Sequence, residues 1–184
     1  MTNTSILSKP TIIFHWLIAL AFILMIPLGF YMRATYNLEL YYYHKSIGVI
    51  VFGLALARIV WRIREGWPAV DDSHPRYELI LARITHWILI LATIGMPLSG
   101  MMYSGAGGFS LHVFEWVIIP PNPSPDDPDK MVPYNDFIYR LGVFGHTKLV
   151  YVVLAALILH VIGSLKHHWL DKDATLKRML GLNR

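Results

Sequence analysis

The sequence predicts an all-α integral membrane protein, built as a four-helix bundle whose helices run alternately up and down. Of its 184 residues, 55% are hydrophobic and only 15% are charged, which is too apolar for an ordinary soluble domain. Four apolar segments are each long enough to cross a bilayer as a helix. Most lysine and arginine residues flank these segments, as is typical of a multi-pass membrane protein.

We expect one membrane domain over residues 1–184. Its spans cover approximately residues 10–32, 44–62, 79–103 and 144–165. A polar connector with two prolines, residues 65–78, joins the second span to the third. A long proline-rich loop, residues 104–143, joins the third span to the fourth, and we expect a short interfacial helix at 109–119 within it.

The distribution of cations predicts the orientation of the bundle. Eleven lysine and arginine residues lie on the side that holds the 65–78 connector and the C-terminal tail. The opposite side holds Arg33, Lys45, Lys130, Arg140 and Lys148. The positive-inside rule therefore predicts that both termini are cytoplasmic and that the loop 104–143 lies outside.

Composition excludes several classes of redox protein and of binding partner. The chain has no cysteine, so it has no disulfide, no iron–sulfur cluster and no covalently attached c-type haem. Its net charge is +4, and most of its cations flank apolar segments. We therefore expect it to contact membrane lipid and not to bind nucleic acid. No glycine-rich phosphate loop is present, so a flavin or nicotinamide domain is not expected in this chain.

Five of the nine histidines lie within the spans or at their ends, at two depths. His44 and His146 stand at the outer end, and His15, His86 and His160 stand in the inner third. His146 and His160 are fourteen residues apart, which is two heptads, so both rings project from nearly the same helix face about 21 Å apart. Two haems stacked across a four-helix bundle require one pair of histidines at each of two depths.

Alternatives stay open for these histidines. A single histidine within a span often makes a hydrogen bond between helices, although a set at paired depths favours a cofactor. At the inner depth either His15 or His86 is a suitable partner for His160, and His15 could also pair with His86. If two histidines fill both axial positions of each haem iron, no site remains for O₂, so the expected work is electron transfer.

Two arginines lie near the depth of the inner histidines. Arg58 and Arg83 could bind haem propionates, because a guanidinium pairs well with a carboxylate. They could equally extend to the interface as topology anchors. On the outer side Arg33, Lys45, Arg140 and Lys148 could attract an anion such as superoxide, or bind propionates or lipid headgroups.

The chain resembles the bacterial cytochrome b561 family, the four-helix dihaem b-type cytochromes of the inner membrane. The resemblance rests on the His15-Trp16 pair, on His44 at the start of the second span, on the spacing of His146 and His160, and on residues 167–179. It covers nearly the whole chain, and the fourth-span spacing is shared with cytochrome b subunits of hydrogenases and formate dehydrogenases.

The resemblance implies the sites and the activity. His15 and His160 would bind the inner b-type haem and His44 and His146 the outer one, with all four as axial ligands of haem iron. His86 would be a non-ligand near a propionate or a quinone. Independently of the resemblance, the position of His167-His168-Trp169 at the inner interface suits a quinone site or an interfacial anchor. One type of member oxidises superoxide and reduces ubiquinone, so superoxide:ubiquinone oxidoreductase is the leading activity. The alternative is an electron-relay subunit that docks a separate dehydrogenase or other redox partner through the loop 104–143.

Overall fold

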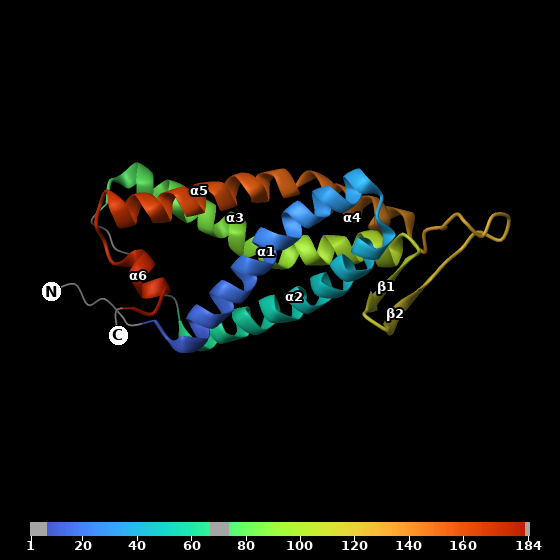
Figure 1. Ribbon diagram of the computed structural model, residues 1–184, viewed down its shortest axis with the longest axis horizontal. Helices are drawn as coiled ribbons and strands as arrows, with labels where there is room; N and C mark the ends of the chain where they lie inside the picture. Colours follow the sequence, from blue (N-terminus) through green and yellow to red (C-terminus); the bar gives the residue numbers. More distant parts are fainter. Residues whose placement is uncertain (1–6, 67–73, 183–184) are drawn as a thin grey trace.

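The computed structural model describes residues 7–66 and 74–182, and it is a bundle of long helices (Figure 1). Residues 67–73, in the middle of the expected connector, lie outside the described residues. The long helices are α1 (Lys9–Thr35), α2 (Leu38–Glu65), α3 (Arg76–Met101) and the pair α4 (Asp136–Lys148) and α5 (Val150–Trp169). Four segments built from them are long and apolar enough to cross a membrane, which confirms the predicted four-span helical class.

The ends of α1 and α2 follow from local sequence signals. Ser8 caps α1 by accepting a hydrogen bond from the Thr11 backbone N–H at 3.4 Å. Asn37 caps α2 in the same way by accepting from the Leu40 N–H at 3.2 Å, so α2 begins six residues before the predicted span. At its other end, Arg62 and Arg64 stand in the last turn and Gly66 follows with a positive φ of 84°.

The expected helix at 109–119 is wrong, because these residues form a β-hairpin. Strand β1 (Phe109–Val113) pairs antiparallel with β2 (Trp116–Pro121), with Leu111 opposite Ile119. The run Trp-Val-Ile-Ile is rich in residues that favour strands, and Phe114, in the turn, has the left-handed φ of 49°. The hairpin and the loop after it lie at the end of the bundle opposite the two termini (Figure 1).

The third and fourth spans continue past the limits that apolar length suggests. A π-helical turn, η1 (Met102–Ala106), extends α3. Gly142 lets α4 approach η1 closely, since a Cβ there would lie 2.4 Å from the Tyr103 backbone nitrogen. A break at Leu149 separates α4 from α5. The short helix α6 (Thr175–Met179) follows, and the Met179 carbonyl accepts a hydrogen bond from Trp16 Nε1 at 2.8 Å.

Side-chain burial is that of a protein surrounded by lipid. The largest apolar side chains point outward, as in Leu24 (60% exposed), Leu91 (67%) and Ile162 (58%). The buried core is small and joins three helices through Ile26 of α1, Ala92 of α3 and Val153 of α5. Val153 stands midway between His146 and His160 in the sequence, so this core lies between the two depths at which histidines gather.

Candidate cofactor-binding site

His44 of α2 and His146 of α4 face one another near the end of the bundle that carries the hairpin. Their ring centroids are 5.9 Å apart and their planes are nearly perpendicular, at 84°. An imidazole nitrogen lies about 2 Å from a first-row metal such as zinc, so two rings that share one ion have centroids about 6 Å apart. The observed separation suits a shared metal and is too long for a hydrogen bond between the rings.

The ring of His146 is fixed by the backbone of α3. Its Nδ1 lies 3.0 Å from the Met96 carbonyl oxygen and 3.4 Å from Ser99 Oγ. A carbonyl can only accept, so Nδ1 carries the proton and Nε2 keeps a free lone pair. A metal-binding histidine is commonly oriented in this way, by donating its second ring N–H to a backbone carbonyl.

Gly100 provides the space that His146 occupies. A Cβ at Gly100 would lie 2.9 Å from Cε1 and 3.1 Å from Nδ1 of His146, closer than van der Waals contact allows. The glycine lies one turn of α3 beyond Met96, so the same helix both orients the ring and leaves room for it. Neither residue could be assigned to the site from sequence, because helix packing brings them there.

His44 carries an unsatisfied atom. Its Nδ1 is buried and has no hydrogen-bond partner among the described residues. Buried polar atoms are almost always paired, so an exception needs an explanation. Direct binding of a metal by this nitrogen would supply one.

The inner histidines come together as a group of three. His160 of α5 has its ring centroid 6.1 Å from that of His15 on α1 and 5.3 Å from that of His86 on α3. His86 is exposed, whereas His15 and His160 are half-buried. The His15–His160 distance is the one closest to that of the outer pair, and the choice between His15 and His86 stays a prediction.

The two arginines are placed differently. Arg58 lies within electrostatic range of His15, His86 and His160 and is itself partly buried. Arg83 is exposed and lines a surface hollow with Arg76, Leu79 and Ile80. Arg58 is therefore close enough to the inner histidines for the predicted contact with a haem propionate. For Arg83 the same prediction rests on its depth in the span alone, and for both residues it stays a prediction.

The two pairs fit the haem group that the sequence suggests. Each pair offers imidazoles from two helices at a spacing that suits one metal ion between them. The outer pair has two further features expected of a cofactor site. One is the unpaired nitrogen of His44, and the other is the glycine that leaves room for the His146 ring. With haem bound, each pair would supply two protein ligands to one iron, an arrangement that suits electron transfer.

The hairpin is held against the start of α2, next to the outer pair. Lys45 Nζ donates to the carbonyl oxygens of Phe109 and Ser110, at 2.8 and 3.3 Å. The fully buried Ser46 Oγ accepts from the Phe114 N–H at 2.8 Å and lies 3.3 Å from His112 Nδ1.

His112 lies in β1 and belongs to this contact. Its ring stacks on Tyr42 with centroids 4.7 Å apart. Partial burial lowers the pKa of His112, and Lys45 acts in the same direction while Glu115 opposes it. The neutral form of His112 is therefore the one that this contact favours.

Comparison with known proteins gives one family. The family model described as prokaryotic cytochrome b561 matches residues 6–182. Among curated proteins, cytochrome b561 homolog 2 of Escherichia coli (strain K12) is 32% identical over 173 residues, which cover 91% of this chain and 87% of that protein.

Two further relatives align over nearly their full lengths. The probable superoxide oxidase CybB of Yersinia pestis is 25% identical over 174 residues, covering 92% of this chain and 93% of its own. Cytochrome b561 homolog 1 of Escherichia coli (strain K12) is 27% identical over 182 residues, covering 94% and 96%.

Proposed function

This chain belongs to the prokaryotic cytochrome b561 family, and on that premise we propose that it carries two b-type haems and moves electrons between a periplasmic donor and the quinone pool. Family membership makes the chain a membrane electron carrier whose cofactor is b-type haem. Family membership and the four spans together make the chain a multi-pass protein of the bacterial inner membrane.

The observation that carries the proposal is the presence of two facing histidine pairs at two levels of one bundle. His44 and His146 would hold the outer haem, and His15 and His160 the inner one. When bound, haem iron accepts and releases one electron at a time. The residues of this chain hold the imidazoles in place, exclude water by the apolar core between the pairs, and supply Arg58 near the inner pair.

Superoxide is the leading candidate for the donor. The name of the relative from Yersinia pestis, a probable superoxide oxidase, supports this substrate. Two superoxide anions give up one electron each and leave as O₂, while one quinone takes two electrons and two protons to become a quinol.

An apolar hollow of about 690 Å³ near the outer end supports a quinone as the acceptor. It lies between η1, β2 and α4 and is lined by Met101, Met102, Ile118, Ile119, Tyr134 and Ile138, among others. Apolar walls with a few polar groups are usual for sites that bind a small ring compound. Tyr134 and Asn135 are the polar lining residues that could meet a quinone carbonyl.

A relay subunit is the second candidate, and the hairpin favours it. Trp116 is 81% exposed and Ile118, two residues further along the strand, is 54% exposed, which gives one face of β2 exposed apolar side chains at the outer end. A redox partner could dock there and pass electrons to the outer haem.

The test is electron transfer by the purified chain alone. We expect superoxide to reduce the haems of the purified chain in detergent and a soluble ubiquinone analogue to be reduced in turn. His146→Ala should abolish superoxide-dependent reduction while an inner haem remains. If the chain reacts only when a co-purified partner is added, the relay role replaces the oxidase role.

A further inference from the structure

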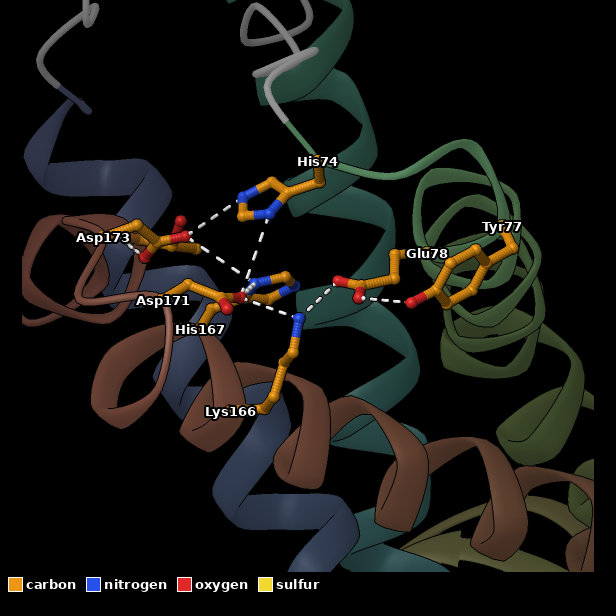
Figure 2. A network of polar contacts seen from close by, with 8 residues as sticks. His74, Tyr77, Glu78, Lys166, His167, Asp171 and Asp173 are labelled. Atoms are coloured by element: carbon orange, nitrogen blue, oxygen red, sulfur yellow. Dashed lines mark hydrogen bonds and ion pairs between the residues drawn. The ribbon is translucent and has the colours of Figure 1, made fainter.

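A second group of side chains of the types that can bind a metal lies at the end of the bundle that carries both termini (Figure 2). It draws on the segment before α3, the start of α3, the end of α5 and the chain after α5. We name it the terminal cluster, and its members are His74, Glu78, Lys166, His167, Asp171 and Asp173. None of these residues belongs to the two histidine pairs described above.

Both imidazoles of the terminal cluster turn the same atom toward one carboxylate. His167 Nδ1 lies 2.7 Å from Asp171 Oδ2, and His74 Nδ1 lies 3.8 Å from the same oxygen. The two rings are close, with centroids 4.5 Å apart. On the far side of its ring, His74 Nε2 faces Asp173 Oδ2 at 3.5 Å. A carboxylate behind a histidine is the usual support of a metal-bound imidazole.

One cation already sits among the acidic groups. Lys166 Nζ lies 2.6 Å from Glu78 Oε2 and 2.9 Å from Asp171 Oδ2 (Figure 2). The cluster holds three carboxylates and this one ammonium, which contacts only Glu78 and Asp171, so two negative charges remain when both histidines are neutral. A divalent cation would balance them.

The donor atoms are nearly close enough to share an ion. One atom from each of His74, Glu78, His167 and Asp171 can be chosen so that all four lie within 4.8 Å of one another. In a tetrahedral zinc site with bonds of about 2.0–2.2 Å, neighbouring donors are about 3.4 Å apart. Side-chain rotations close that difference, since Glu78 and Asp171 are held by the flexible side chain of Lys166.

We propose that His74, Glu78, His167 and Asp171 bind one divalent transition-metal ion of the zinc type, with Asp173 supporting His74. Two imidazoles with two carboxylates favour such an ion over magnesium or calcium, which prefer oxygen donors alone. The ion takes the place of the Lys166 ammonium between Glu78 and Asp171. It ties the start of α3 to the end of α5 and to the tail, at a point away from the histidine pairs.

Zinc binding to the whole, haem-loaded and tag-free chain tests the proposal. We expect competition with a chromophoric zinc indicator, in excess magnesium, to give one zinc per chain. The absence of cysteine removes thiolates as competing ligands. His167→Ala and Asp171→Asn should each weaken zinc binding at least about ten-fold. Haem absorbance, measured on the same samples, checks that the variants fold.

Two further variants separate a metal site from an ion-pair cluster. His112→Gln is the matched control, because His112 lies in β1, at the end of the bundle opposite the terminal cluster, and this variant should bind zinc as the parent chain does. Lys166→Met should tighten zinc binding several-fold, since it removes the competing ammonium. If zinc does not bind stoichiometrically, if His167→Ala leaves binding unchanged, or if Lys166→Met weakens it, the proposal is overturned. Haem content and superoxide oxidation are measured separately from zinc binding. The absence of zinc binding would therefore not contradict the proposed function.

Discussion

Gly100 of α3 lies directly against the ring of His146 on α4, where a Cβ would come 2.9 Å from Cε1. Because the Met96 carbonyl holds the same ring through Nδ1 at 3.0 Å, the imidazole cannot move aside without losing that hydrogen bond. α3 therefore sets the position of a residue that we assign to the outer haem.

Gly100→Ala should displace this ring and lower the content of the outer haem, with a loss of about 1–3 kcal/mol of stability from overpacking. The inner haem should stay, because its histidines lie on the other side of the core. The measurement is the haem-to-protein ratio with the reduced-minus-oxidised spectrum. Gly95→Ala on the same helix is the control, since a Cβ at Gly95 has no atom within 4 Å. Equal spectra for the two variants would contradict the assignment.

His15→Ala and His86→Ala distinguish the two possible partners of His160. We expect His15→Ala to lose the inner haem and His86→Ala to keep both, although the His86 ring is the nearer to His160, at 5.3 Å. The reason is that His86 is exposed while His15 is half-buried. The number of haems per chain in the two purified variants decides between these partners. Loss of one haem in His86→Ala, with both kept in His15→Ala, would make His86 the ligand.

The number and class of the spans could be predicted from the sequence because apolar length alone specifies them. The hairpin could not, since residues 109–119 are a short apolar run that periodicity does not assign to helix or strand. The roles of Gly100 and Met96 depend on how α3 packs on α4. In the same way, His74 and His167 meet only because the start of α3 and the end of α5 lie together.

Lowering the pH should loosen the hairpin from α2. The pKa of His112 is below its ordinary value of about 6.5, so the contact with Tyr42 and Ser46 favours the neutral ring. The contact of His112 with Tyr42 and Ser46 stabilises the hairpin fully above the ordinary pKa of histidine. This stabilisation is lost as the pH falls through the lowered pKa of His112. The protection factor of the Phe114 amide, which donates to Ser46, should fall over this range once the intrinsic pH dependence of exchange is divided out. In His112→Gln this fall should disappear; its persistence would assign it to another group.

Thr11→Val should destabilise the contact between α1 and α2. The Thr11 hydroxyl is buried and donates to Glu65, while Arg62 and Trp61 donate to it at 3.0 and 3.3 Å. Loss of these bonds should cost about 1 kcal/mol or more, measured as thermal unfolding in detergent. Thr35→Val is the control, because the Thr35 hydroxyl bonds to Tyr31 of its own helix and is exposed. Equal losses in the two variants would mean that the Thr11 contacts contribute nothing specific.

The haem content of the purified chain tests the central claim most directly. A pyridine haemochrome assay with a reduced-minus-oxidised spectrum should give two b-type haems per chain, both low-spin, because two histidine pairs stand ready to fill their axial positions. One haem per chain would show that one pair has been misassigned. No haem, from cells with adequate haem supply, would contradict the electron-transfer account altogether.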